Sequence, residues 1–342
     1  MFRCRYGAHL SQEHVAQLVA PHQDTLELVH SWLRNHDVPS SSISMTHGGR
    51  WLTLTGVPVS QANELLGASY QLYRHTGTND TAILRTIGYS LPEVLHAHVQ
   101  TVVPTTYFST RPLWQIPQKR PVNTTADMVP RELVNEVTPS FLRSLYRTAT
   151  YVPNGTALNV LGVTALLGQY PSPTDFTQFM TDFRADAVDP VFIFVPVNGG
   201  GYDPSNPGIE ANNNIQYTAG LTFPTPIIFY SIGGDLKFTP DTYQPAPGDV
   251  FMEWLKFVLD KSKVPQTITM SYSVFEKYIP LEYGMTICDM FAELGARGAS
   301  VIIASGNYGV GPAAAKDCLD GSGRFQFFTE FPVTCTCSII IL

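Results

Sequence analysis

Glu210 and Asn214 are the two side chains whose types and spacing could most directly do chemistry. They follow a loop rich in glycine, asparagine and proline (residues 198–204), and a four-residue spacing on a helix places both on one face. A carboxylate beside an amide can act as a general base at a pH near its own pKa. A glutamate in the first turn of a helix also complements the helix dipole, so the position alone is compatible with a purely structural role.

The distribution of histidine limits the hydrolytic chemistry that the chain can perform. All nine histidines lie between His9 and His98. The second half alone therefore cannot supply a Ser-His-Asp or Cys-His arrangement, or a histidine-rich zinc site. If this half is a hydrolase, its base must be a carboxylate.

Two glycine-rich stretches have some features of nucleotide-binding loops. The three glycines at 199–201 are followed by Tyr-Asp-Pro instead of the Lys-Ser/Thr and helix of a phosphate loop, so we expect a turn there. Residues 306–311 follow a predicted strand but lack the Gly-x-Gly-x-x-Gly spacing. A nucleotide-binding α/β protein is a further alternative.

Composition divides the 342 residues into two unlike halves. The net charge of -7 is the sum of +2 over residues 1–150 and -9 over residues 151–342, which suggests two units with separate roles. The acidic balance argues against a nucleic-acid partner. The sequence contains no apolar run of the roughly 18 residues that a membrane span needs, so we expect no membrane partner.

The elements that must position these residues follow from periodicity and turn signals. In the first unit we expect helices capped by Ser11 and Asp24 and an α+β arrangement. Its helices are expected at 11–20, 25–36, 60–66 and 92–99, and its strands at 43–45, 51–55, 71–74 and 82–87. The second unit alternates strand and helix, which predicts a parallel sheet with sites at the carboxyl ends of its strands. Its strands are expected at 158–166, 191–197, 226–231, 267–273 and 300–305, and its helices at 173–183, 209–220, 249–260 and 282–298.

Short motifs in a fixed order along nearly the whole chain resemble the sedolisin family of serine-carboxyl peptidases, most closely its fungal tripeptidyl-peptidase branch. These motifs lie at residues 6–11, 15–21, 67–73, 138–146, 199–203, 210–217, 269–272, 304–307 and 331–332. The resemblance implies an α/β fold with a subtilisin-like parallel sheet and helices on both faces, C-terminally truncated, preceded by an α+β ferredoxin-like prodomain. The implied domains are an inhibitory activation prodomain at 1–109, a linker at 110–137 and a partial peptidase domain at 138–342.

The resemblance also implies roles for three residues. In the family a serine attacks the peptide carbonyl at acid pH, a glutamate is the general base, and two aspartates orient the base and complete the oxyanion hole. Glu210 is then the base, Asn214 stands at the position of the orienting aspartate, and Asn307 stands at the position of the oxyanion aspartate. An asparagine at 214 can hydrogen-bond Glu210 but cannot share a proton with it, whereas an amide at 307 is itself a good oxyanion donor.

The Gly-Thr-Ser motif that carries the nucleophile in the family does not occur in the 342 residues. The resemblance therefore implies a truncated chain or an early-terminated gene model that is inactive as given. The alternative is a non-catalytic pseudo-peptidase. The expected partners are a peptide or protein substrate and the chain's own prodomain.

The family also implies a location and a metal. Its members are secreted and carry calcium at a C-terminal site, so we expect an extracellular protein, although this chain opens without the apolar core of a signal peptide. We expect that calcium site to be absent from this chain. Of the five cysteines, Cys318 and Cys335 either pair in an oxidising compartment or remain buried thiols.

Overall fold

The computed structural model describes most of the chain outside the central linker. The described residues are 7–46, 48–74, 82–106, 108, 137–155, 159–166, 168–187, 189–233, 250–306, 322, 324, 327, 329–336 and 339–341. The predicted linker at 110–137 lies outside them except for Val137, and so does Asn307. We call residues 7–108 the N-terminal unit and residues 137–341 the C-terminal unit.

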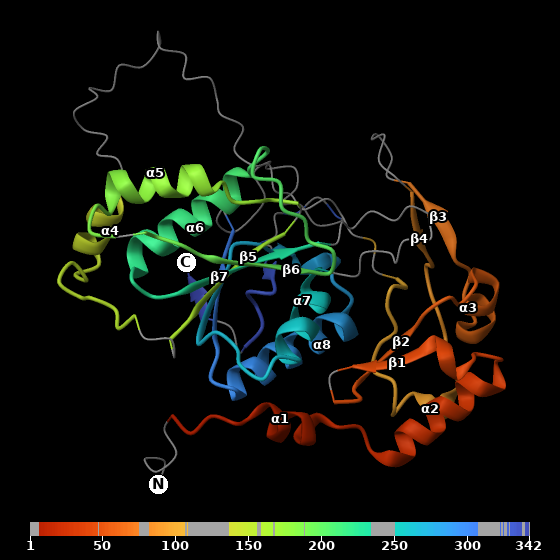
Figure 1. Ribbon diagram of the computed structural model, residues 1–342. Coiled ribbons are helices and arrows are strands. Elements are labelled where there is room, and N and C mark those ends of the chain that lie inside the picture. The colour runs from red at the N-terminus through yellow and green to blue at the C-terminus, as the bar shows by residue number, and fades with distance from the viewer. Residues whose placement is uncertain are drawn as a thin grey trace.

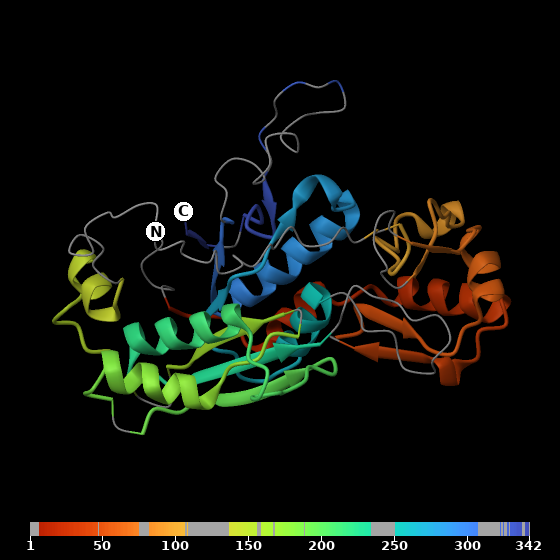
Figure 2. The ribbon, with the colours of Figure 1, turned by 90° about the horizontal axis from the view of Figure 1, so that it is seen from above.

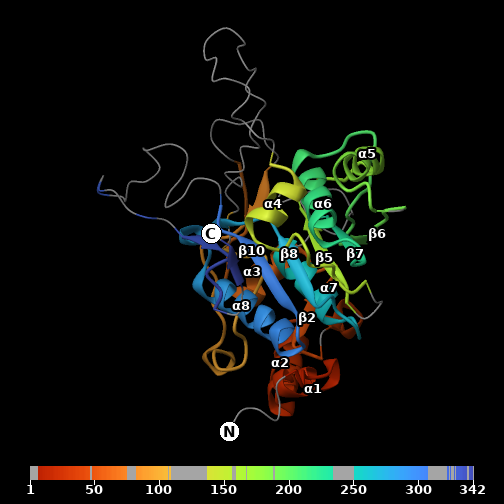
Figure 3. The same cartoon turned by 90° about the vertical axis from the view of Figure 1, so that its left-hand side faces the viewer.

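The described part of the C-terminal unit is built on a six-stranded, fully parallel sheet. The strand order is β12-β10-β8-β5-β7-β6, and Figure 3 shows β10, β8, β5 and β7 side by side in that order. The strands are β5 (Leu161–Ala165), β6 (Ile193–Val197), β7 (Ile227–Ile232), β8 (Thr267–Met270), β10 (Ser300–Ala304) and β12 (Ile339–Ile341). The predicted parallel α/β architecture is therefore confirmed.

Helices cover both faces of this sheet (Figure 2). The helices are α5 (Pro173–Phe183), α6 (Ile209–Thr222), α7 (Val250–Leu259) and α8 (Leu281–Ala296). On one face, Phe176 and Ile215 of α5 and α6 pack on Phe229 of β7. On the other face, Trp254 of α7 and Phe291 of α8 belong to the larger core cluster, and both are buried. Because alternate residues of a strand point to opposite faces, a single strand such as β7 contributes to both cores.

The N-terminal unit is α+β, as expected (Figure 1). Its strands pair antiparallel in two separate ladders, β1 with β2 and β3 with β4. Its elements are α1 (Gln12–Val19), α2 (Gln23–Asn35), η2 (Ser40–Ser42), β1 (Ile43–Thr46), β2 (Trp51–Leu54), α3 (Val59–Leu66), β3 (Gln71–Tyr73), β4 (Ile83–Arg85) and η3 (Glu93–Leu95). Ser11 caps α1 as predicted, accepting a hydrogen bond from the backbone N–H of His14.

Two expectations for the N-terminal unit are wrong. Asp24 does not cap α2, because the helix begins earlier and the Nδ1 atom of His22 accepts the backbone N–H of Asp24. The predicted helix at 92–99 is only the 3-10 turn η3, which follows Pro92 and holds the buried Leu95. The hydrogen bond at His22 sets the start of α2, and the burial of Leu95 accompanies the short turn η3. The spacing of apolar residues in the sequence indicates neither feature.

Several short elements of the C-terminal unit lie where the sequence predicted none. They are α4 (Pro139–Leu145), β9 (Val274–Phe275), η4 (Glu276–Tyr278), β11 (Glu330–Phe331) and β12. Strands β9 and β11 pair antiparallel, with Glu330 opposite Phe275. Two-residue strands carry no periodicity of their own, so only their pairing identifies them.

Cys335 forms a disulfide with Cys288, so the predicted choice between a Cys318–Cys335 bridge and free thiols is wrong for Cys335. The two Cα atoms lie 5.0 Å apart, within the range that a disulfide requires. The ladder of β9 and β11 brings the chain after β11 next to α8, which explains the pairing. Cys318 lies outside the described residues.

The N-terminal unit contacts α7 and α8 of the C-terminal unit (Figure 1). The backbone N–H of Leu10 donates to the carbonyl of Ala296 at 3.0 Å. Arg50 forms ion pairs with the buried Glu293 and with Asp289, both on α8. A mostly apolar cavity of about 660 Å³ lies between the two units, lined by residues that include Trp51 of β2 and Met252 of α7. No helix among the described residues is long and apolar enough to cross a membrane.

Candidate active site

A glycine-rich loop leads from strand β6 into helix α6 and sets the position of Glu210. The chain turns at Asn198 and Gly199, both with positive φ, and Gly200 then crosses the end of β7. A Cβ atom on Gly200 would lie 1.8 Å from the carbonyl oxygen of Ser231, so only glycine fits this crossing. The loop is thus the turn that the sequence predicted, and it delivers Glu210 to the carboxyl ends of the strands.

Glu210 and Asn214 lie one turn apart on α6, as their spacing predicted. The Oγ atom of Ser271, in the segment after β8, donates a hydrogen bond to Oδ1 of Asn214 at 3.0 Å. Burial raises the pKa of Glu210, and the amide of Asn214 opposes part of this rise. The structure therefore brings α6 and the carboxyl end of β8 together around a partly buried carboxyl group.

Tyr272 adds a buried phenol to this group. Burial raises the pKa of Tyr272 far above its usual range, and the negative charge of Glu210 raises it further. The phenol therefore stays protonated at every pH at which Glu210 titrates. In the sequence, Tyr272 is only the last residue of the motif at 269–272. The proximity of Tyr272 to Glu210 depends on how β8 lies relative to α6.

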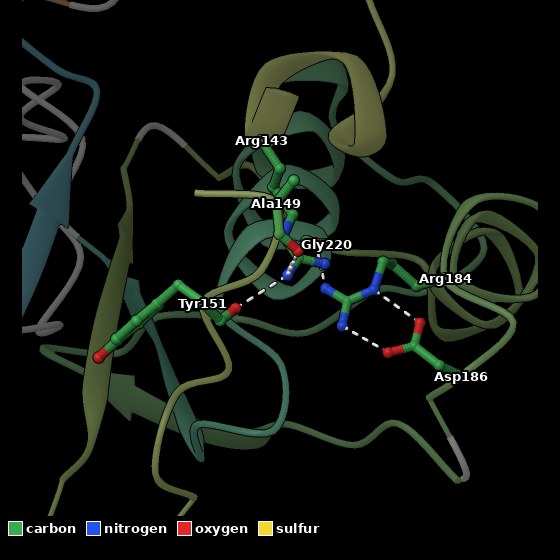
Figure 4. A network of polar contacts seen from close by, with 6 residues as sticks. All are labelled: Arg143, Ala149, Tyr151, Arg184, Asp186 and Gly220. Atoms are coloured by element: carbon green, nitrogen blue, oxygen red, sulfur yellow. Dashed lines mark hydrogen bonds and ion pairs between the residues drawn. The ribbon is translucent and has the colours of Figure 1, made fainter. Parts of the chain in front are cut away.

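The far end of α6 is held by a network of arginine contacts (Figure 4). Arg184 binds both carboxylate oxygens of Asp186 at 2.8 Å and donates a short hydrogen bond to the carbonyl of Gly220 on α6. Arg143 of α4 donates to the carbonyls of Ala149 and Tyr151 at 3.0 and 2.9 Å. Arg184 places a cation at the C-terminal end of α6, where it complements the helix dipole, and its bond to Gly220 ties this end of α6 to the segment after α5.

The third predicted site residue, Asn307, lies outside the described residues. The described chain reaches Gly306, two residues after the end of β10. Within the described residues, the carboxyl ends of β8 and β10 also carry a partly buried carboxyl group that sequence analysis did not single out, Glu330. Its sequence signal is an acidic residue directly before the Phe-Pro motif at 331–332.

The described residues contain no group of three or more histidine, cysteine, aspartate or glutamate side chains that could hold a metal ion. No chemical step is assigned to a metal here.

Comparison with known proteins assigns the N-terminal unit to a family. Residues 3–108 match the family model described as the pro-kumamolisin activation domain. This match covers the four short strands and the helices of the N-terminal unit and ends before the linker.

Comparison of whole chains extends the assignment. The chain is 30% identical to the probable tripeptidyl-peptidase SED2 of Trichophyton verrucosum, over 97% of this chain and 57% of that protein. It is also 30% identical to the tripeptidyl-peptidase SED2 of Arthroderma otae, with the same coverage, and 29% identical to the probable SED3 of Arthroderma benhamiae, over 96% of this chain and 56% of that protein. A solved Pseudomonas sedolisin, in complex with pseudo-iodotyrostatin, matches 60% of this chain and 52% of its own at 16% identity, with a TM-score of 0.41.

The chain thus combines an activation domain with a parallel α/β unit, and its similarity to the tripeptidyl-peptidase relatives extends over nearly all of its length. Over nearly its whole length the chain is homologous to fungal tripeptidyl-peptidases of the sedolisin family. It spans 57% of the length of these two SED2 relatives.

Proposed function

We propose that the chain is part of the zymogen of a secreted serine-type peptidase that removes tripeptides from protein N-termini at acid pH. The observation that carries the proposal is Glu210, a carboxyl group of raised pKa at the carboxyl ends of the strands, behind a matched activation domain. The names of the relatives support the reaction class. The contacts of Arg50 and Leu10 with α8 support an N-terminal unit that docks on the C-terminal unit before activation.

In this proposal each site residue has a defined task. Glu210 removes the proton from the attacking serine hydroxyl and later returns it to the leaving amine. Asn214, held by Ser271, keeps the carboxyl group of Glu210 in place without taking up a proton itself. The amide of Asn307 donates to the oxyanion of the tetrahedral intermediate, a contact of a kind worth about 3 kcal/mol.

The serine of this scheme is not assigned to any of the 342 residues, because they contain no Gly-Thr-Ser. We therefore propose that the 342-residue polypeptide by itself does not hydrolyse peptides. Calcium, which the family is expected to bind at its C-terminal site, is given no task in this scheme.

The test uses a fluorogenic tripeptide substrate between pH 3 and pH 7. The 342-residue polypeptide is expected to give no turnover. A polypeptide extended by the corresponding C-terminal segment of the Arthroderma otae relative is expected to cleave the substrate at acid pH, and Glu210→Gln should lower kcat by at least about 100-fold. Turnover by the unextended chain, or full activity of the extended Glu210→Gln variant, would overturn the proposal.

The asparagine at 214 favours a second candidate, a non-catalytic pseudo-peptidase that binds peptides without cleaving them. An asparagine cannot share a proton with Glu210, which removes the carboxyl pair expected of the family. This candidate predicts that the extended polypeptide binds a peptide but shows no turnover at any pH. Asn214→Asp would then be the variant to restore activity in the extended polypeptide.

A further inference from the structure

Glu330 lies on the short strand β11, whose partner β9 directly follows the segment that reaches Asn214. The Oγ atom of the buried Ser273 donates a short hydrogen bond to Oε2 of Glu330. The backbone N–H of Glu276 donates to the carbonyl of Thr329 at 3.0 Å and keeps β11 beside β9. The carboxyl group of Glu330 is therefore held at the carboxyl end of β8.

The other oxygen of Glu330 lies against the carboxyl end of β10. Gly306 follows β10 with a φ of +93°, and a Cβ atom there would lie 2.4 Å from Oε1 of Glu330. The positive φ favours glycine, and a larger side chain at 306 would displace the carboxylate end of Glu330. One carboxyl group thus contacts the ends of two parallel strands, and in open α/β sheets those ends are where reactive groups gather.

The segment of Ser271, Tyr272 and Ser273 connects this carboxyl group to Glu210. Ser271 binds Asn214, Tyr272 feels the charge of Glu210, and Ser273 binds Glu330. Three consecutive residues therefore contact both carboxyl environments.

Burial raises the pKa of Glu330 as it does that of Glu210, and no charged partner among the described residues contributes to either rise. The charged side chains on the elements packed against β11 have other contacts or are exposed. Oε2 of Glu276 accepts a hydrogen bond from Thr329 at 2.7 Å, Nζ of Lys277 lies over the ring of Phe275, and Glu282 at the start of α8 is exposed. An uncompensated carboxyl group in such a place takes up a proton more readily than an exposed one.

We propose that Glu330 is a positioning residue of the candidate active site, which acts through the Ser271–Ser273 segment that also holds Asn214. It holds the ends of β8 and β10 in register through Ser273 and Gly306. This inference rests on the proposed function for its meaning, but its geometry and titration can be tested without any peptidase activity.

The experiment compares the full 342-residue chain with Glu330→Gln and with Glu276→Gln, a matched control on the neighbouring turn. Infrared difference spectra between pH 7 and pH 5 report protonated carboxyl groups, and hydrogen exchange reports the segments 271–276 and 300–306. We expect Glu330→Gln to remove one protonated-carboxyl band and to speed exchange in both segments by at least about threefold. Glu276→Gln should leave the band and the exchange unchanged.

Several results would overturn the proposal. They are an unchanged carboxyl band in Glu330→Gln, unchanged exchange in both segments, or the same effect from Glu276→Gln. If Glu330→Gln does not fold, Ser273→Ala provides the same test, because it should shift the band of Glu330 without removing it, and an unshifted band would count against the proposal. If these results hold but the extended polypeptide shows no peptidase activity, the proposed function is rejected and the geometry of Glu330 stands.

Discussion

The carboxyl groups that lie at the two ends of helix α6 have opposite shifts in pKa. At the C-terminal end, Asp186 is bound by the guanidinium of Arg184, whose hydrogen bonds hold the pKa of Asp186 below its usual range. At the N-terminal end, Glu210 has no cation partner among the described residues, and burial raises its pKa. One helix thus joins an anchor that keeps its charge to a site that loses its charge in mild acid.

Because of this difference, Asp186 and Glu210 contribute to the free energy of unfolding in different ranges of pH. Because the pKa of Asp186 is lowered, its stabilising contribution is present above the unfolded pKa of about 3.9 and is lost only as the pH falls through the lower folded value. Because the pKa of Glu210 is raised, its contribution is fully present below the unfolded pKa of about 4.3 and is lost as the pH rises through the folded value. Mild acid therefore changes the protonation of the site while the anchor still holds the helix.

The largest expected loss in the free energy of unfolding comes from removing the disulfide near the candidate active site. Cys288–Cys335 ties α8 to the chain just after β11, the strand of Glu330. Removing it with Cys288→Ala and Cys335→Ala should lower the free energy of unfolding by about 3 kcal/mol, measured by urea unfolding under oxidising conditions. Cys318→Ala, which leaves this bridge intact, is the control. Equal losses in the two variants would mean that the bridge does not form as described.

The next largest loss is expected from removing the contacts of Arg184 at the C-terminal end of α6. Arg184→Met keeps an unbranched apolar stem but removes the hydrogen bonds to Asp186 and to the carbonyl of Gly220. We expect a loss of about 2 kcal/mol in urea unfolding, because a buried arginine that binds a backbone carbonyl contributes more than a surface ion pair.

Asp186→Asn is the matched control for this anchor, because the side chain of Asp186 is 65% exposed. Its loss should stay below about 1 kcal/mol. If the two variants lose the same amount, the anchor depends on the ion pair alone and the contact with Gly220 contributes little.

The two ends of α6 also differ in how far the sequence alone could predict them. Local patterns predict the helix at 173–183 beside the anchor and, at the site end of α6, the spacing of Glu210 and Asn214, and both agree with the structure. The rest of the site side depends on pairing between distant segments. Glu330 meets Ser273 across 57 residues, through two-residue strands that have no periodicity. Cys288 meets Cys335 for the same reason, and no spacing in the sequence favoured that pair over Cys318 and Cys335.

Strand β12 is a related case. Its three isoleucines have high β-propensity, but a short apolar run does not indicate its neighbour in a sheet. The structure pairs it parallel with β10, with Ile302 opposite Ile339. Long periodic helices and buried strands are thus predictable, whereas the edge of the sheet and the second carboxyl group of the site are not.

The smallest expected effect sharpens the comparison by adding a charge to the site end of α6. Asn214→Asp places a second carboxylate one turn from Glu210, and at pH 7 the repulsion between like charges should lower the free energy of unfolding by about 1 kcal/mol. The loss should shrink as the pH falls toward 4.5, because one of the two raised carboxyl groups takes up a proton and the repulsion ends. Asn213→Asp, at an exposed position on the same helix, separates a general effect of added charge from one that involves Glu210. Urea unfolding of both variants between pH 4.5 and pH 7 is the measurement, and a loss for Asn214→Asp that persists unchanged at pH 4.5 would show that the two carboxyl groups do not share a site.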